Sequence, residues 1–194
     1  MKNFQFSRLS GRALLASLYA TQGLLLLAAC ILLAFQGDRA RLLLAPPHGI
    51  APWISAALFA AAAFAANLLL ERYAPRRAVH DPLAWRLFRR MPAWHILLAC
   101  FVVAFSEELL FRGAVQHWLG VIGTSILFSL LHARYLKHWL PAAFVFCVSC
   151  GLGWLLERTG TLWMPVAAHF WFDAAAGFII RYRRHEESEG ETGP

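Results

Sequence analysis

The sequence predicts an all-α, polytopic integral membrane protein built as one bundle of about six transmembrane helices. Its 194 residues are 59% hydrophobic and only 15% charged, and the mean hydropathy is +0.53. A soluble domain of this size carries far more charge. Apolar segments near the ~20 residues needed to cross a ~30 Å hydrocarbon core recur along the whole chain. No length remains for a separate soluble domain, so residues 1–194 are expected to form one membrane domain.

Six apolar segments account for the expected helices, and short polar connections separate them. The first follows three basic residues of the N-terminal tail, but it is too long for the apolar region of a usual signal peptide, so we expect it to stay as a membrane helix. Residues 185–194 are polar and are expected to form a disordered tail. The expected spans are Leu14–Phe35, Ile50–Leu70, Pro92–Trp118, Val121–Leu136, His138–Leu156 and Leu162–Ile180.

The distribution of Lys and Arg predicts the orientation of this bundle. With the N-terminus in the cytoplasm, 14 of the 18 basic residues lie on the cytoplasmic side, and only Arg39, Arg41 and Arg158 lie outside. This asymmetry follows the positive-inside rule and places both termini in the cytoplasm. The net charge of +7 is thereby explained by topology and anionic lipid headgroups. The expected partner is the lipid bilayer, and no nucleic-acid partner is needed.

Three charged residues interrupt the third apolar segment: Glu107, Glu108 and Arg112. An ionised side chain at the centre of a bilayer costs from ~3 to over 10 kcal/mol, so such groups are usually paired and functional. Glu108 and Arg112 are four residues apart and share a helix face. Glu107 points ~100° away. The spacing predicts that arginine holds one glutamate while the other faces a different group.

Two later segments carry polar residues at the same four-residue spacing, Phe128 with His132 and His169 with Asp173. At a rise of ~1.5 Å per residue, Glu107 lies ~22 Å from the inner face, and His132 and His169 lie ~16 Å and ~10 Å from the outer face. We therefore expect one buried site, in the outer half of the membrane. Taken singly, the glutamate and arginine could form a structural bridge, and each histidine could hydrogen-bond a neighbouring helix.

The ordered motifs Glu107-Glu108-x-x-x-Arg112, Phe128-x-x-x-His132 and His169-x-x-x-Asp173 resemble the signatures of the CPBP intramembrane proteases, also called ABI. The family includes the CAAX prenyl endopeptidases, and the resemblance covers residues 92–180, the expected protease core. It implies a glutamate-type endopeptidase in which Glu107 and His132 activate water, while His169 and Asp173 stabilise the oxyanion. Glu108, Arg112 and Phe128 would support this site.

Asp173 departs from a common form of the third motif, in which asparagine occupies this position. An amide donates a hydrogen bond to an oxyanion, whereas aspartate does so only when protonated, so Asp173 could instead orient His169 or bind a metal. Glu107, His132, His169 and Asp173 are plausible zinc ligands. No H-E-x-x-H pattern is present, and the resemblance favours a reaction without a cofactor, with zinc as the alternative. A transporter, a proton relay or an inactive scaffold could use the same buried groups.

The expected substrate is a membrane-anchored or lipidated protein, because the short connections leave no room for a soluble recognition domain. An outer-half site would suit the C-terminal membrane anchor of an exported bacterial protein. The expected location is the bacterial inner (cell) membrane, in which the chain would be a multi-pass protein.

Overall fold

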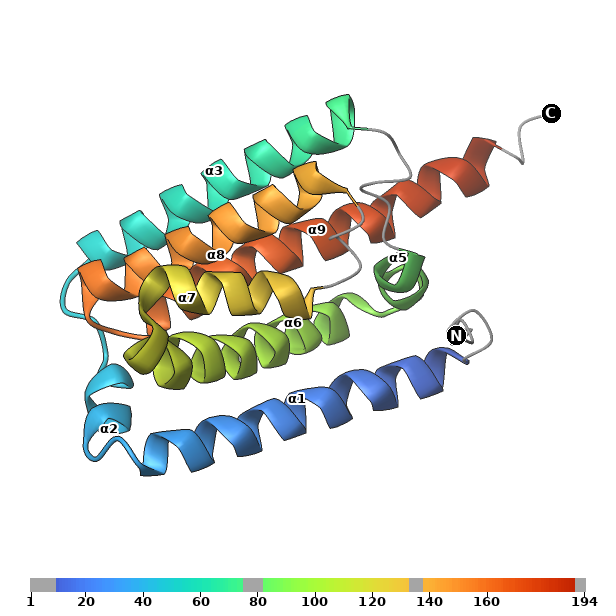
Figure 1. The fold of residues 1–194 in the computed structure, drawn as a ribbon. Helices are drawn as coiled ribbons and strands as arrows, with labels where there is room; N and C mark the ends of the chain where they lie inside the picture. Colours follow the sequence, from blue (N-terminus) through green and yellow to red (C-terminus); the bar gives the residue numbers. More distant parts are fainter. Residues whose placement is uncertain (1–9, 75–81, 133–137, 191–194) are drawn as a thin grey trace.

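The computed structural model describes residues 10–74, 82–132 and 138–190, and side chains as far as Tyr182. Within these ranges every regular element is a helix, which confirms the all-α prediction. Most helices lie alongside one another in an elongated bundle (Figure 1). In chain order the helices are α1 (Gly11–Ala34), α2 (Arg39–Leu43), α3 (Ala51–Tyr73), α5 (Pro82–Phe88), α6 (Ala93–Glu108), η2 (Leu109–Val115), α7 (Gln116–Leu131), α8 (Trp139–Thr159) and α9 (Trp163–Gly190).

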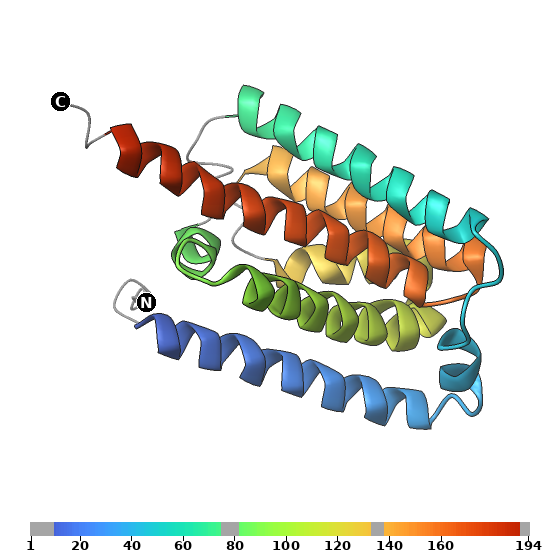
Figure 2. The ribbon, with the colours of Figure 1, turned by 180° about the vertical axis from the view of Figure 1, so that it is seen from behind.

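Five helical stretches among the described residues are long and apolar enough to cross a membrane, and one of them is the continuous stretch Ala93–Leu131. This stretch contains a reversal at Gly120, whose φ of 64° and ψ of −179° are not helical. Glycine adopts this backbone at little cost because it has no Cβ. Figures 1 and 2 show α6 and α7 running side by side in opposite directions. The protein is an integral membrane protein, but the expected count of six full spans is not confirmed, because residues 121–131 rise only ~17 Å.

The start of α1 and the end of α9 lie at the same end of the bundle (Figures 1 and 2). The other end holds α2, with Arg39 and Arg41, and the end of α8, with Arg158. This arrangement agrees with the grouping of basic residues that the sequence predicted. The choice of cytoplasmic side stays a prediction.

The last helix is longer than the sequence predicted. We expected a disordered tail from residue 185, but α9 continues to Gly190. Three of the six residues 185–190 are glutamate, which is a good helix former, and this gives a physical reason for the difference. Residues 191–194 lie outside the described residues, as does the end of the expected span Val121–Leu136.

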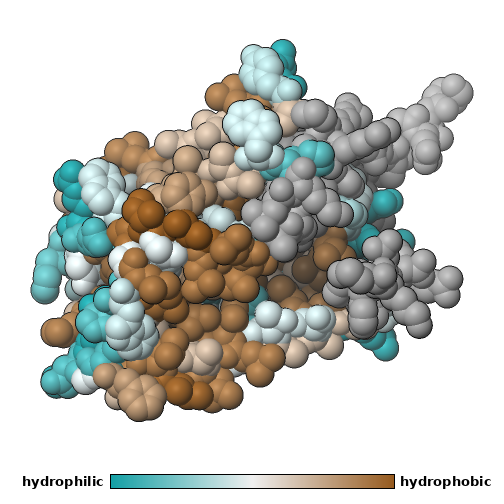
Figure 3. All heavy atoms as spheres, viewed as in Figure 1, coloured by the Kyte–Doolittle hydropathy of each residue, from teal (hydrophilic) through white to brown (hydrophobic). Residues whose placement is uncertain are grey.

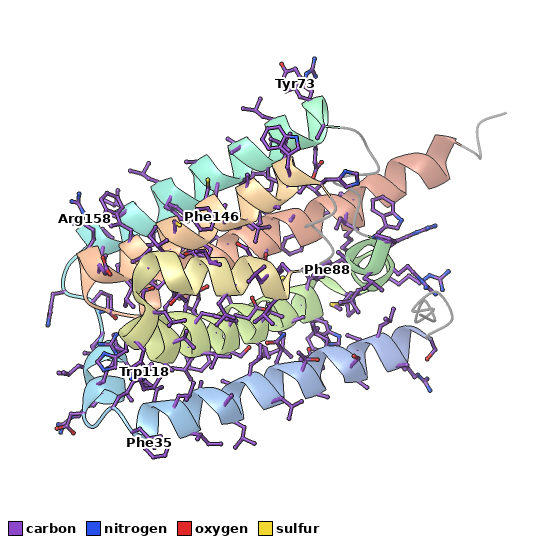
Figure 4. All side chains as sticks on the ribbon, viewed as in Figure 1. Phe35, Tyr73, Phe88, Trp118, Phe146 and Arg158 are labelled. Atoms are coloured by element: carbon purple, nitrogen blue, oxygen red, sulfur yellow. The ribbon has the colours of Figure 1, made fainter. Side chains whose placement is uncertain are left out.

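Apolar side chains cover the outside of the bundle, as expected for contact with lipid. Leu24 and Leu58 are 67% and 66% exposed, and hydrophobic residues fill the middle of the face in Figure 3, with hydrophilic residues gathered at the α2 end. Exposed aromatic residues lie near the ends: Figure 4 labels Phe35 and Trp118 at the α2 end and Tyr73 near the other. Aromatic side chains at these levels suit the two membrane interfaces.

A π-helix, η2, directly follows the paired glutamates, and it was not predicted. Gln36 of the α1–α2 connection and Arg39 at the start of α2 bind its far end: Gln36 Nε2 donates to the carbonyl of Ala114 at 2.9 Å, and Arg39 Nε donates to that of Gly113 at 3.2 Å. Single π-helical turns within membrane and soluble helices are frequent at functional sites. These contacts connect the α2 end of the bundle to the turn that carries Arg112.

Candidate active site

The two adjacent glutamates of α6 occupy different environments. Glu107 lines a large cavity inside the bundle, whereas the Glu108 side chain is fully buried behind the cavity wall. The described residues form no hydrogen bond or ion pair with the Glu107 carboxylate. The structure therefore places the neighbours on two faces of one helix, as their ~100° separation predicts. Glu107 is the carboxylate that a molecule in the cavity would meet.

Glu108 lies at the centre of a chain of polar contacts, the polar arc, which runs from Asp173 through His169, Glu108 and Arg112 to Ser149. Its Oε2 lies 3.1 Å from Arg112 Nε, which is the four-residue pair predicted from the sequence. The atoms form an ion pair, although their angle is too bent for a well-aligned hydrogen bond. Its Oε1 lies 2.9 Å from His169 Nδ1, and His169 Nε2 lies 3.4 Å from Asp173 Oδ2. Arg112 Nη2 in turn donates to Ser149 Oγ at 3.0 Å.

His169 lines the same cavity as Glu107, and its Nδ1 lies at hydrogen-bond distance from the neighbouring glutamate, Glu108. The packing of α9 against α6 brings His169 to the Glu108 side of the helix. Asp173 lies within reach of the other ring nitrogen, and this geometry matches the alternative in which Asp173 orients His169.

His132 is positioned by its own helix end. It follows the last residue of α7, and its Nδ1 lies 2.9 Å from the carbonyl oxygen of Phe128. A carbonyl can only accept a hydrogen bond, so Nδ1 is the donor, and in the neutral ring Nε2 carries the lone pair. The Phe128 ring stacks on the His132 ring with centroids 4.3 Å apart. The Arg112 guanidinium lies 5.3 Å from the same Phe128 ring. Phe128 thus contacts both the buried arginine and the histidine.

The cavity brings the expected catalytic residues together. Its volume is about 1540 Å³, and Glu107, His132, His169 and Asp173 all line it. Much of its remaining wall is apolar. From these residues the cavity extends along α3 to Arg72 and along the whole of α5. It therefore reaches the end of the bundle at which α1 begins, not the α2 end.

The described residues contain no group of three or more His, Cys, Asp or Glu side chains arranged to hold a metal ion. The alternative zinc ligands Glu107, His132, His169 and Asp173 line one cavity without converging on one point. Both ring nitrogens of His169 already face carboxylates. A zinc ion needs an imidazole nitrogen with a free lone pair. The reaction without a metal and the zinc alternative both stay predictions, which chelation can distinguish.

Two residues of this site were not predicted from the sequence. Ser149 lines the cavity and accepts the hydrogen bond from Arg112, but a serine in an apolar segment carries no signal of this. Gln22 of α1 is 4% exposed, lines the same cavity and hydrogen-bonds Ser106, the residue before Glu107. A glutamine in the middle of an apolar helix is unusual, so the sequence could have indicated Gln22 as a candidate site residue. The first span, which carries no motif, therefore contributes to the cavity wall.

Residues 89–175 match the family described as type II CAAX prenyl endopeptidase, Rce1-like. All seven motif residues predicted from the sequence lie within this range. The matched segment belongs to the CPBP family. A relative, the uncharacterized protein YpbD of Bacillus subtilis (strain 168), is 36% identical over 117 residues. The match covers 56% of this chain and 62% of that relative, so the chain spans less than two thirds of the relative's length. No solved structure matches the chain.

The CPBP segment runs from the end of α5 into α9 and so includes the whole polar arc. Helices α1 and α3 lie outside it, although both line the cavity. The family implies protease activity, which is hydrolase chemistry. Its description does not identify the residues that perform the reaction in this chain.

Proposed function

We propose that this protein is an intramembrane endopeptidase that hydrolyses a peptide bond of a membrane-associated protein. The observation that carries the proposal is the convergence of Glu107, His132, His169 and Asp173 on one cavity within a bundle of apolar helices. Ionisable groups this deep in a membrane protein usually serve a reaction or a transport path. The CPBP match over residues 89–175 favours the reaction.

In the proposed mechanism Glu107 is the general base. Its carboxylate lines the cavity and has no ion-pair partner among the described residues, so it is available to accept a proton from water. The resulting hydroxide attacks the carbonyl carbon of the scissile peptide. His132 orients the water through Nε2, since Nδ1 is held by the Phe128 carbonyl. The proton taken by Glu107 then passes to the leaving nitrogen as the C–N bond breaks.

Glu108, Arg112 and Asp173 have positioning roles in this proposal. Glu108 holds His169 through Nδ1 and is itself held by Arg112, while Asp173 holds the other ring nitrogen. Rigid placement of a reacting group within a few tenths of an ångström is a major source of rate enhancement. Phe128 places the His132 ring by stacking.

The reaction is proposed to need no metal, because the donor groups do not converge on one point. The zinc-dependent alternative makes a different prediction. Activity of the purified protein should survive exhaustive chelation. Loss of activity on chelation that added zinc restores would establish the alternative.

The proposed substrate is a membrane-anchored or lipidated protein, and it enters from the end of the bundle that holds α5. The cavity reaches that end and is largely apolar, which suits a lipid-embedded segment. By the charge distribution this end is cytoplasmic. The cavity thus favours entry from the cytoplasmic side over the outer-half site suggested by the depth estimates, and over an exported anchor as substrate. The bacterial relative fits the expected bacterial cell membrane.

The test is cleavage by the purified protein in proteoliposomes that carry candidate membrane proteins of the same organism. Mass spectrometry of the products locates the new terminus and the side of cleavage. Glu107→Gln should abolish processing, while Glu157→Gln, at an exposed position on α8, serves as the matched control. Unchanged processing by Glu107→Gln would refute the protease proposal and favour a transporter, a proton relay or a scaffold. Products cut only at the α2 end would refute the proposed entry side.

A further inference from the structure

The proposed reaction creates an oxyanion, and the groups expected to stabilise it are engaged elsewhere. His169 presents both ring nitrogens to carboxylates, those of Glu108 and Asp173. Asp173 is itself a carboxylate, which accepts hydrogen bonds when ionised. Amide hydrolysis gains much of its rate from donors aimed at the developing negative charge. The cavity wall must therefore supply a donor from another residue.

Ser149 of α8 has a hydroxyl proton that no described residue accepts. Its oxygen accepts a hydrogen bond from Arg112 Nη2 at 3.0 Å. Several other hydroxyls in this bundle donate to the carbonyl four residues earlier in their own helix, as Ser129 does at 2.8 Å and Thr159 at 2.7 Å. The buried hydroxyls of Thr124 and Ser125 also lack an acceptor among the described residues, but neither residue lines the cavity. Ser149 makes no such bond to its helix. Its side chain is fully buried and lines the cavity that contains Glu107.

The position of Ser149 in the polar arc also favours this residue as the missing donor. The arc runs from Asp173 through His169, Glu108 and Arg112 to Ser149. Its inner members, Glu108 and Arg112, are buried behind the wall, whereas both of its ends line the cavity. A hydroxyl that accepts from a guanidinium is polarised and becomes a stronger donor.

We propose that Ser149 is a catalytic residue that donates a hydrogen bond to the carbonyl oxygen of the scissile peptide. The bond strengthens as that oxygen gains negative charge in the tetrahedral intermediate. Ser149 keeps its proton throughout, and no covalent bond to its oxygen forms. Arg112 is the positioning residue behind it. This inference rests on the proposed peptidase function and adds a catalytic group from α8, which none of the three motifs contains.

The experiment compares Ser149→Ala with Ser129→Ala in the proteoliposome cleavage assay. Ser129 is also a buried serine, but its hydroxyl is bound within its own helix and it does not line the cavity. Loss of one oxyanion donor lowers kcat by roughly 10²-fold. We expect that loss for Ser149→Ala with KM within about threefold of the parent value, because the hydrogen bond strengthens only in the transition state. Ser129→Ala should keep kcat within about threefold, by the same reasoning.

A second pair of variants covers the case in which Ser149→Ala fails to fold. Ser149→Thr and Ser149→Val have side chains of the same shape and differ in the hydroxyl. Ser149→Thr should be at least about tenfold faster than Ser149→Val, since it alone retains the donor. Equal rates for this pair, or a kcat for folded Ser149→Ala within about threefold of the parent, would overturn the assignment. Failure of the whole protease proposal is recognised separately, because Glu107→Gln would then be as active as the parent.

Discussion

Replacing Glu108 with glutamine tests the buried arc directly, because it removes one charge and keeps the shape of the side chain. Glu108 and Arg112 are both fully buried, with 3.1 Å between the charged atoms. After the substitution Arg112 would retain Ser149 Oγ as its hydrogen-bond partner and would carry an uncompensated charge. Removing one partner of a buried ion pair costs about 3–5 kcal/mol. We expect Glu108→Gln to lower the free energy of unfolding by that amount.

The measurement is reversible unfolding in mixed micelles, followed by circular dichroism, with the cleavage assay in parallel. The matched control is again Glu157→Gln, which makes the same chemical change at an exposed position and should shift stability by less than about 0.5 kcal/mol. The double variant Glu108→Gln/Arg112→Met removes both charges. It should recover at least about 2 kcal/mol relative to Glu108→Gln, because no buried charge is then left unpaired.

Activity should not recover with stability in this double variant. His169 would still lack the carboxylate that holds its Nδ1, so catalysis should remain at least about tenfold below the parent. A stability loss below about 1 kcal/mol for Glu108→Gln would refute the buried-pair reasoning. A double variant less stable than both single variants would refute it as well.

Three further predictions concern neighbouring features. Phe128→Leu should lower kcat by about tenfold, measured by cleavage, because the histidine ring loses its stacking partner; an unchanged kcat would remove its positioning role. Gly151→Ala should destabilise the bundle by about 1–3 kcal/mol in the unfolding assay, because an added Cβ would lie 2.2 Å from Phe59 Cε2, while Gly23→Ala, which meets nothing within 4 Å, should stabilise α1 by about 0.5–1 kcal/mol. Equal effects of these two changes would contradict the packing. Asp173→Asn should keep kcat within about tenfold, because an amide still accepts from the histidine, whereas Asp173→Ala should lose more; equally large losses in both variants would show that the carboxylate charge itself is needed.

The membrane environment and the helix faces could be predicted because both depend on local sequence. Hydrophobic content decides whether a segment prefers lipid, and the 3.6-residue period decides that Glu108 and Arg112 share a face while Glu107 does not. The reversal near Gly120 was also expected as a short connection. The expected return span, Val121–Leu136, ends outside the described residues, and within them α7 ends at Leu131.

The contacts across helices could not be predicted in the same way. Periodicity shows that His169 and Asp173 face one direction, but it does not show which carboxylate of α6 they meet. The π-helix after Glu108 and the route of the cavity toward α5 depend on packing between segments distant in sequence. Depth estimates counted from the segment ends gave only the distance of each site residue from a membrane face. They could not show from which end of the bundle a cavity reaches the site.

The sequence by itself determined that this protein is a helical membrane protein with carboxylates and imidazoles buried in it, because burial cost and helical spacing follow from residue type and order. The tertiary structure decided which partner each of those groups contacts. Glu107 lines the cavity, Glu108 contacts Arg112 and His169, and Ser149 is the last residue of the polar arc. The physical reason is that each buried polar group must find its partner on a neighbouring helix, and the packing of α6, α8 and α9 selects that partner.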